Sequence, residues 1–461
     1  MTIWQPDLDR SKPLYLAIAD AMSRDVESGV LKNGSRLPPQ RDLAWKLGVT
    51  LGTVTRAYKE AETRGLLEGE VGRGSFIRSR PPVSGLPELT DEASAIMDLS
   101  HAIPPPVIKP EELDAAMQSV MRDPRKLDLL DYAPPEGFHL HRKMARDWLR
   151  LSNIDITEKD VVISAGAHLG LITVLEAIGE ANEAVLAERT NYALLRTTFK
   201  NAHLQPVPIA MDEDGMLPEA LDRAAAERKA RIMYIVPTIQ NPTTATMSAR
   251  RREDIVAVAR ARDLTIVEDD IFRLLDARVQ PPTFYQLAPE RTFHITSLSK
   301  TLAPGLRIGF LVSPQGQERI LRSHIRNMAA RTVGITGEIA RYWIESGLAQ
   351  TILERSRSEV ESRRNLFMEV FRHFEFRCEP GAPYAWLRVP DHWNPNRLVQ
   401  SLASRKIRVT PESAFDLLGA SGNHVRICFG APRVGWKLRQ AFEDVAALMR
   451  ASEMDDYTPV A

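Results

Sequence analysis

Residues 297–307 read Ser-Leu-Ser-Lys-Thr-Leu-Ala-Pro-Gly-Leu-Arg, and this stretch decides how the larger part of the chain is interpreted. Lys300 comes just after an apolar run that is typical of a buried strand. It is flanked by Ser297 and Ser299 and followed seven residues later by Arg307. A lysine amine condenses with carbonyl groups, and hydroxyls together with a guanidinium bind a phosphate. The combination predicts a pyridoxal 5'-phosphate site in which Lys300 forms the Schiff base and the other three residues hold the phosphate.

Residues 297–300 also fit the Ser-x-x-Lys motif of penicillin-binding proteins. In those proteins the motif works together with Ser-Asp-Asn and Lys-Thr-Gly. This chain has Lys300-Thr301-Leu302 and no Ser-Asp-Asn. The cofactor interpretation is therefore favoured, and it depends on the residues that accompany Lys300.

Short apolar runs alternate with helical patterns from about residue 98 onward. Such runs are typical of strands that are buried on both faces of a parallel sheet. The expected strands are 161–164, 184–187, 232–236, 265–267, 293–297 and 308–312. The pattern predicts an α/β domain with a mostly parallel, doubly wound sheet, followed by a smaller α+β part at 376–450.

Several polar residues follow these strands in an order that suits the same cofactor. Residues 164–168 end a strand and begin a helix, whose free N–H groups at Ala167 and His168 would bind a phosphate. Tyr192 is placed to stack on the pyridine ring, and Asn241 offers an amide to the ring oxygen O3'. Taken singly, each of these residues is equally compatible with a structural role.

Asp269 and Arg426 complete this set. Asp269 follows the apolar run 265–267, and an ionised carboxylate beside the pyridine nitrogen keeps that nitrogen protonated. Arg426 lies in a second β-prone run, where its guanidinium could bind a substrate carboxylate through two N–H groups. A single Asp at a strand end is more commonly a helix cap, so these assignments also depend on the whole set.

The first 80 residues have a different pattern. Leu14, Ile18, Met22 and Val26 recur every four positions, as on one face of an amphipathic helix, and Thr50 is placed to cap a later helix. The expected elements are helices at about 14–28, 40–47 and 51–64, and a hairpin made of 66–68 and 75–77. Helix, short helix, tight turn, helix and hairpin are typical of a winged helix-turn-helix.

Residues 36–80 carry nine Lys and Arg side chains against five acids, a local charge of +4 that suits a polyanion. In this fold the third helix lies in the major groove of DNA. The candidate groove-facing residues are Thr50, Thr53, Thr55, Arg56 and Lys59. Arg36 and Arg41 are expected near phosphates, and Arg73 at the tip of the wing.

The composition excludes several classes of protein. The 461 residues carry 60 Lys and Arg against 60 Asp and Glu, and 44% are hydrophobic, as in ordinary globular proteins. No apolar run is long enough for a membrane span, and the first residues lack a signal-peptide core. The two cysteines, Cys378 and Cys428, match no metal or redox spacing. We therefore expect a cytoplasmic protein without a metal site.

These patterns predict four segments. They are a winged helix-turn-helix at 10–79, a proline-rich linker at 80–97, a cofactor-binding domain at 98–453 and a tail at 454–461.

The N-terminal pattern resembles the GntR family of bacterial regulators. The resemblance is carried by residues 36–44 (RLPPQRDLA), 47–50 (LGVT), 53–54, 57–58 and 72–77 (GRGSFI). Where many members have an arginine after the capping residue, this chain has Leu51-Gly52. The resemblance therefore predicts DNA binding but not the operator sequence.

Residues 98–450 resemble fold-type-I aminotransferases, and the whole chain is similar to the MocR subfamily of GntR regulators. The matching pieces are Tyr132, Gly137, Arg142, 166–168, Glu188, Tyr192, Asn241-Pro242, 268–270, 297–307 and Arg426. The resemblance implies a homodimer in which Tyr132 reaches the phosphate of the partner subunit. Two positions depart from it: Phe272 replaces a tyrosine that donates to O3', and Thr190 replaces a proline.

The resulting hypothesis is a pyridoxal-phosphate-dependent transcriptional regulator that senses an amino compound, or the cofactor itself, at Lys300. Two alternatives stay open. One is an active class I/II aminotransferase with an appended DNA-binding domain, against which Phe272 argues. The other is a DNA-binding protein that uses a metabolic fold only to dimerise, and it predicts that no cofactor is bound.

Overall fold

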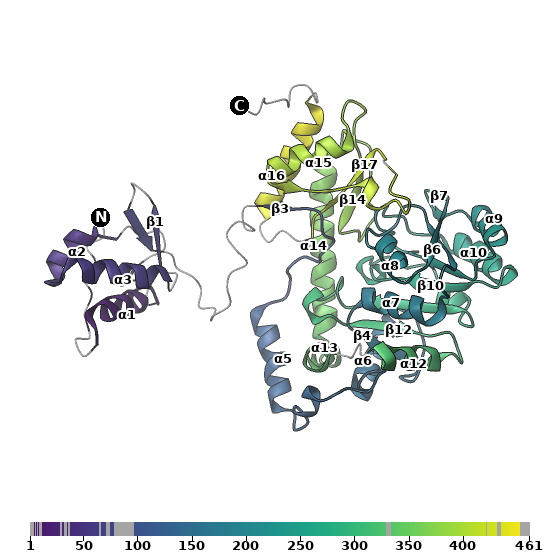
Figure 1. The fold of residues 1–461 in the computed structure, drawn as a ribbon, viewed down its shortest axis with the longest axis horizontal. Coiled ribbons are helices and arrows are strands. Elements are labelled where there is room, and N and C mark those ends of the chain that lie inside the picture. Colours follow the sequence, from purple (N-terminus) through teal and green to yellow (C-terminus); the bar gives the residue numbers. More distant parts are fainter. Residues whose placement is uncertain are drawn as a thin grey trace. The chain divides into compact units, whose positions relative to one another are not determined.

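The computed structural model describes residues 4, 6, 8, 12–27, 30–31, 35, 37–63, 66–70, 74–77, 96–328, 333–420, 422–430 and 435–451. The chain divides into two compact units, Met1–Asp91 and Glu92–Ala461. Figure 1 shows the course of the chain through each unit. No helix in these described ranges is both long and apolar enough to cross a membrane.

The first unit has three helices and a hairpin. They are α1 (Leu14–Glu27), α2 (Gln40–Leu47), α3 (Leu51–Thr63) and the antiparallel strands β1 (Leu67–Glu70) and β2 (Gly74–Ile77). Gly48 ends α2 in the left-handed conformation, with φ of 65°, which makes the tight turn before α3. Apolar side chains from all three helices, among them Ile18, Leu43 and Val54, form the core. This is the winged helix-turn-helix that the sequence predicts.

A seven-stranded sheet organises the second unit. Its strand order is β4 (Val161–Ser164), β12 (Gly309–Val312), β11 (Thr292–Ser297), β10 (Thr265–Asp269), β9 (Ile232–Ile235), β5 (Ala184–Glu188) and β6 (Gln205–Ile209). β12 runs antiparallel to β4 and β11, and the other pairs are parallel. The predicted mostly parallel α/β sheet is therefore confirmed.

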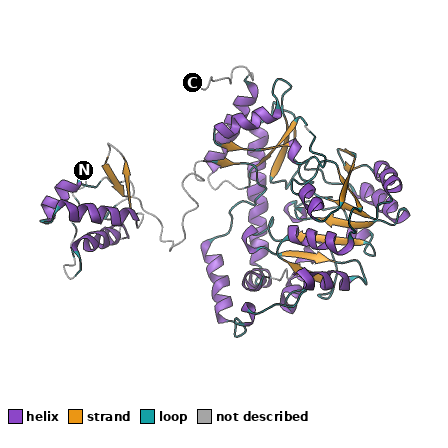
Figure 2. Ribbon diagram, in the orientation of Figure 1, coloured by secondary structure: helices purple, strands orange, loops and turns teal. Residues whose placement is uncertain are grey.

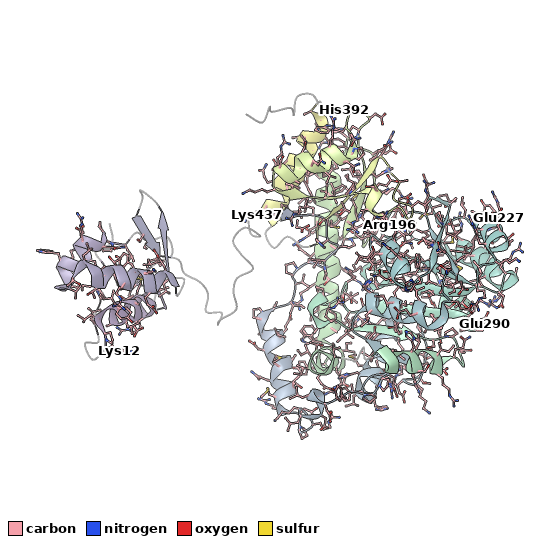
Figure 3. All side chains as sticks on the ribbon, viewed as in Figure 1. Lys12, Arg196, Glu227, Glu290, His392 and Lys437 are labelled. Atoms are coloured by element: carbon pink, nitrogen blue, oxygen red, sulfur yellow. The ribbon has the colours of Figure 1, made fainter. Side chains whose placement is uncertain are left out.

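Helices cover both faces of this sheet, as Figure 2 shows. One face packs against α7 (Ala167–Ile178), α8 (Leu195–Asn201) and α12 (Glu318–Met328). The other packs against α9 (Pro218–Arg228), α10 (Ala249–Ala261) and α11 (Phe284–Leu287). Side chains such as Glu227 and Glu290 point outward from these layers (Figure 3). Burial on both faces explains why the strands are apolar without alternation.

A smaller α+β part follows the large sheet. Its sheet has the order β13 (Phe376–Arg377), β14 (Tyr384–Arg388), β17 (His424–Cys428) and β16 (Thr410–Pro411). It packs against α14 (Leu348–Val370), α15 (Pro395–Ser404) and α16 (Gly435–Arg450) around Phe367, Phe371 and Phe442. Beside it, β3 (Met97–Asp98) pairs in parallel with β15 (Ile407–Arg408). The chain thus enters the second unit along the edge of its smaller part.

The remaining helices of the second unit pack beside β4, at one edge of the large sheet. α5 (Pro110–Arg122), α6 (His139–Leu149) and α13 (Gly334–Glu345) pack together around Trp148 and Trp343. β7 (Met211–Asp212) and β8 (Gly215–Met216) form a short hairpin. Short 3-10 turns lie at Asp128–Leu130, Arg150–Ser152, Arg273–Leu275, Pro304–Leu306 and Glu412–Ala414.

Candidate cofactor site and DNA-binding face

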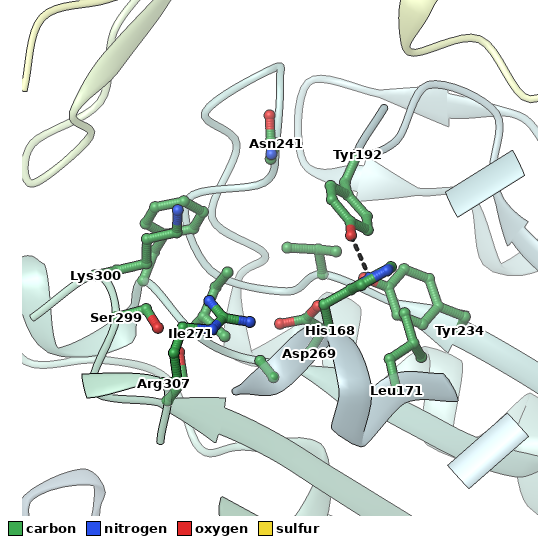
Figure 4. A pocket seen from close by; sticks show the side chains of 14 residues that line it. His168, Leu171, Tyr192, Tyr234, Asn241, Asp269, Ile271, Ser299, Lys300 and Arg307 are labelled. Atoms are coloured by element: carbon green, nitrogen blue, oxygen red, sulfur yellow. Dashed lines mark hydrogen bonds between the residues drawn. The ribbon is translucent and has the colours of Figure 1, made fainter. Parts of the chain in front are cut away.

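A pocket lies where the carboxyl ends of the central strands meet the first turn of α7 (Figure 4). Ligand sites in open α/β sheets are commonly found at this edge. The residues that line the pocket are Ala167, His168, Leu171, Tyr192, Tyr234, Val236, Asn241, Asp269, Ile271, Phe272, Ser297, Ser299, Lys300 and Arg307. Nine of the ten cofactor-binding residues expected from sequence are therefore brought together, and Tyr132 is the exception.

Lys300 lies half-buried in the turn that follows β11. Its Nζ donates a hydrogen bond to the carbonyl oxygen of Ala102 over 2.5 Å and lies 5.8 Å from the centre of the Phe272 ring. Burial lowers the pKa of Lys300 to about 8, and the positive charges of Arg426 and Arg307 act in the same direction. About a tenth of this amine is therefore neutral and nucleophilic at pH 7, far more than for an ordinary lysine.

The start of α7 and Arg307 form an anion-binding corner. Gly166 precedes the helix with φ of 95°, a backbone conformation that favours glycine, and a Cβ at this position would lie 2.9 Å from Nη2 of Arg307. Arg307 Nη2 donates to the carbonyl oxygen of Ala165 over 3.2 Å. Free N–H groups at a helix N-terminus together with a guanidinium favour a phosphate. Ser297 and Ser299, both buried, also line the pocket.

Asp269 has two carboxylate oxygens in different surroundings. Oδ2 accepts a hydrogen bond from the Tyr234 hydroxyl over 2.8 Å, whereas Oδ1 is buried without a partner among the described residues. Burial raises the pKa of Asp269 to about 6. A buried acceptor without a partner is costly unless a ligand supplies a donor. The protonated ring nitrogen of pyridoxal 5'-phosphate is such a donor, so the residues present fit this cofactor.

Tyr192 and His168 form a pair on the side of the pocket away from Lys300 (Figure 4). The Tyr192 hydroxyl and His168 Nδ1 are 2.5 Å apart, and the two rings meet edge to face. Burial, with the charge of Arg307 as a second cause, lowers the pKa of His168. A neutral imidazole is therefore expected there, with the tyrosine ring held at a fixed angle beside the pocket.

Arg426 lies on β17 of the smaller sheet and is bonded to the predicted cofactor site. Its Nη1 donates to Asn241 Oδ1 over 2.6 Å, and its Nη2 donates to the carbonyl oxygen of Ser100 over 2.5 Å. The guanidinium lies 4.6 Å from the centre of the Phe415 ring. Nε is buried and has no partner in the described part of the chain. Arg426 thus keeps an unused donor, as a site for a carboxylate requires.

Tyr132 is not part of the pocket formed by its own chain. Its side chain is 81% exposed, and Leu127 and Leu130 just before it are also exposed. The role that the sequence resemblance gives to Tyr132, toward the partner subunit, remains a prediction.

Tyr234 was not predicted from sequence, although it lines the pocket and contacts Asp269. It lies within β9, whose sequence Ile-Met-Tyr-Ile gives no sign of a polar function. Phe272, in contrast, lies in the pocket at the position where the sequence resemblance points to a missing hydroxyl.

The predicted DNA-binding residues lie on α2 and α3 where they are described. Thr50 caps α3, its Oγ1 accepting from Thr53 N over 3.2 Å, and Thr55 Oγ1 donates to Gln40 Oε1 over 2.8 Å. Arg41 and Lys59 are exposed. Arg36 and Arg73 lie outside the described residues.

Arg56 is exposed but stacks its guanidinium on the Tyr15 ring, 4.5 Å from the ring centre. Tyr15 belongs to α1, so this contact holds Arg56 against the first helix. Its predicted role at the DNA is not tested by this contact, which nevertheless adds a cation–π interaction within the unit.

Comparison with known proteins supports the assignment of both units of the chain. Residues 96–437 match aminotransferase class I and II, and residues 14–77 match bacterial regulatory proteins of the gntR family. The HTH-type pyridoxine biosynthesis transcriptional regulator PdxR of Corynebacterium glutamicum is 27% identical over 90% of each chain. The vitamin B6 salvage pathway transcriptional repressor PtsJ of Salmonella typhimurium is 27% identical over 81% of this chain and 85% of its own.

Solved structures confirm the fold of the second unit. A kynurenine aminotransferase from Pyrococcus horikoshii superposes with a TM-score of 0.71 at 23% identity, over 78% of this chain and 92% of that one. An archaeal alanine:glyoxylate aminotransferase gives a TM-score of 0.73 at 20% identity, over 79% and 93%. The fold family implies pyridoxal 5'-phosphate as the cofactor. The chain belongs to the aminotransferase class I and II family and, with its N-terminal gntR-family domain, has the architecture of MocR-type regulators.

Proposed function

We propose that this protein is a pyridoxal-phosphate-dependent transcriptional regulator in which a ligand in the pocket of the second unit changes DNA binding by the winged helix-turn-helix. The observation that carries the proposal is the pairing, in one chain, of a gntR-type domain with a pocket that keeps Lys300, Arg307 and an unpartnered Asp269 oxygen. Relatives named as regulators, which align over most of the chain, support it.

Each pocket residue has a distinct task in this proposal. When bound, the cofactor supplies an electrophilic carbonyl carbon to which amines add reversibly. Lys300 would present its amine to that carbon, and Asp269 would hold the ring nitrogen. Tyr192 would pack on the ring and Asn241 would bind O3'. The phosphate would be held by Ala167, His168, Ser297, Ser299 and Arg307.

The effector is proposed to be an amino compound with a carboxylate. The free Nε of Arg426 gives that carboxylate a donor, and the amine competes with Lys300 for the cofactor. Alternatively, the effector is pyridoxal 5'-phosphate itself. An amino compound and the cofactor would both act through Lys300.

Residues 98–102, which follow the proposed linker (80–97), would couple ligand binding in the pocket to the N-terminal unit. Asp98 Oδ1 accepts from the backbone N–H and the hydroxyl of Ser100, over 2.9 and 2.6 Å. The carbonyl oxygen of Ser100 is bound by Arg426, and that of Ala102 by Lys300. A carboxylate at Nε of Arg426 and a cofactor at Lys300 would engage the two cations that hold these carbonyl oxygens, and so would act on the chain next to the linker.

A homodimer in the cytoplasm is part of the proposal. Exposed apolar side chains run along α5 and the turn after it, and such a stripe is typical of a protein interface. They are Leu113, Met117, Met121, Leu127 and Leu130, and they lead to Tyr132. A second copy of the chain would cover this stripe and bring Tyr132 toward the phosphate in the neighbouring pocket.

An active aminotransferase is the second candidate function, because the pocket gathers the expected cofactor-binding residues. Phe272 argues against rapid turnover, since a phenyl ring lies where a hydroxyl would tune the cofactor. Binding of the full chain to its own promoter fragment, measured with and without the cofactor and a panel of amino acids, tests the regulator. Effector-sensitive DNA binding supports it, whereas steady keto-acid formation with DNA binding that ignores every ligand supports the enzyme.

A further inference from the structure

The contact between Tyr234 and Asp269 joins two neighbouring strands beneath the pocket. Tyr234 on β9 pairs with Val267 on the parallel strand β10. Asp269 lies two residues further along β10 and therefore on the same face of the sheet. The Tyr234 hydroxyl donates to Oδ2 of Asp269 over 2.8 Å, and both side chains line the pocket (Figure 4).

Tyr234 is held by its surroundings as well as by this hydrogen bond. The residue is fully buried, and its ring meets Phe199 edge to face, with 6.4 Å between centres. Burial raises the pKa of Tyr234 well above its ordinary value. The hydroxyl therefore stays protonated, and toward an ionised carboxylate it acts only as a donor.

Several nearby groups affect the ionisation of Asp269. Asp270, next on the same chain, disfavours its ionised form, whereas His294 on β11 and the backbone N–H of Ile271 favour it. Glu188 at the end of β5 is a second buried carboxyl, with a pKa raised to about 8 by burial. Tyr234 is the side chain that donates directly to Asp269.

We propose that Tyr234 is a positioning residue that keeps Asp269 ionised and directs its free Oδ1 at the pocket, where the ring nitrogen of pyridoxal 5'-phosphate would be bound. This inference rests on the proposed function only in its use of that cofactor. It assigns a role to a residue outside the predicted set, and it does not depend on DNA binding or on the identity of an effector.

Substitution Tyr234→Phe in the full chain tests this role because it keeps the ring and its packing and removes only the donor. Tyr285→Phe is the matched control, since Tyr285 is also buried but lies outside the pocket. The readouts are the dissociation constant of pyridoxal 5'-phosphate and the absorbance spectrum of the complex between pH 6 and 8.5. We expect Tyr234→Phe to weaken binding about tenfold near pH 6.5 and less at pH 8.5, where Asp269 is ionised in both proteins.

A double-mutant cycle with Asp269→Asn separates this role from core packing. If Tyr234 acts through the carboxylate, Tyr234→Phe has less than a twofold effect on binding when Asp269 is already Asn. An equal effect in both backgrounds, or wild-type affinity and pH dependence in Tyr234→Phe, overturns the inference. A wild-type protein that binds no pyridoxal 5'-phosphate overturns the proposed function as well, so the two failures are distinguishable.

Discussion

Arg426 donates to Asn241 over 2.6 Å and thereby links the smaller sheet to the loop after β9 of the large sheet. One partner is expected to bind a ligand carboxylate, and the other to bind O3' of the cofactor. Occupation of Arg426 would therefore act on the cofactor through a single hydrogen bond. This arrangement would make the absorbance of the bound cofactor a reporter of the effector.

Arg426→Lys should uncouple carboxylate recognition from cofactor binding. Lysine lacks the planar fork that binds Asn241 and Ser100 and would leave Nε for a carboxylate. We expect amino acids to alter the spectrum at concentrations at least about tenfold higher than in wild type, while amines without a carboxylate act as before. Arg388→Lys, at a partly exposed arginine of β14, is the matched control. An unchanged amino-acid titration would remove Arg426 from the effector site.

Phe272→Tyr should return the hydroxyl that the fold family usually places beside the cofactor. Phe272 is buried, and its ring lies 5.8 Å from Lys300 Nζ and 5.4 Å from the Tyr384 ring. A donor at O3' stabilises negative charge there, so we expect the pH midpoint of the visible spectrum to move and transamination to rise. Spectral titration and keto-acid assays of both proteins measure this. Identical midpoints would show that the loss of the hydroxyl has no electronic consequence.

Asp98→Ala should reduce the effect of ligands on DNA binding without preventing the ligands from binding. Its carboxylate fixes Ser100, whose carbonyl oxygen is bound by Arg426. Without the hydrogen bonds from Ser100 to Asp98, ligand binding at Arg426 should affect the segment after the linker less. We expect cofactor affinity within about threefold of wild type, but a much smaller ligand-induced change in DNA affinity. Asp155→Ala, at a side chain that is 93% exposed, is the control. A full response in Asp98→Ala would exclude this route.

The buried amine of Lys300 predicts a pH-dependent stability for the cofactor-free protein. Burial lowers the pKa of Lys300 from 10.5 to about 8, so the folded state disfavours the charged amine. Unfolding takes up a proton between these pH values, and the free energy of unfolding therefore rises with pH from about 8 to about 10.5.

Lys300→Met removes this contribution. Denaturant unfolding should show the mutant more stable than wild type by up to about 3 kcal/mol below pH 8, with the difference vanishing above pH 10.5. Parallel pH curves for the two proteins would mean that the amine is solvated in the folded state.

Much of the fold follows from the sequence because local patterns and tertiary packing agree. The apolar runs before Asp269 and Lys300 became β10 and β11, and the residues after them line the pocket. The edge strand β6 was not among the expected strands, because Pro206 and Pro208 lack the N–H groups that a central strand needs. At an edge, with one partner strand, this loss is tolerated.

Side-chain partners are harder to predict because they depend on register between distant strands. Nothing in the local sequence shows that Tyr234 reaches Asp269, since the two are 35 residues apart and meet only through the pairing of β9 with β10. Likewise, α3 was predicted correctly, but the stacking of Arg56 on Tyr15 depends on how α1 packs against it. Spacing predicts which residues share a face, and packing decides what they contact.

The visible absorbance of the purified protein, compared with Lys300→Ala in the presence of added pyridoxal 5'-phosphate, tests the central claim most directly. The account predicts a visible band of protein-bound pyridoxal 5'-phosphate that persists after unbound cofactor is removed, is absent in Lys300→Ala and is changed by an amino acid with a free carboxylate. A wild-type spectrum that stays without such a band would contradict it. The fold would then serve this chain only as a scaffold for DNA binding.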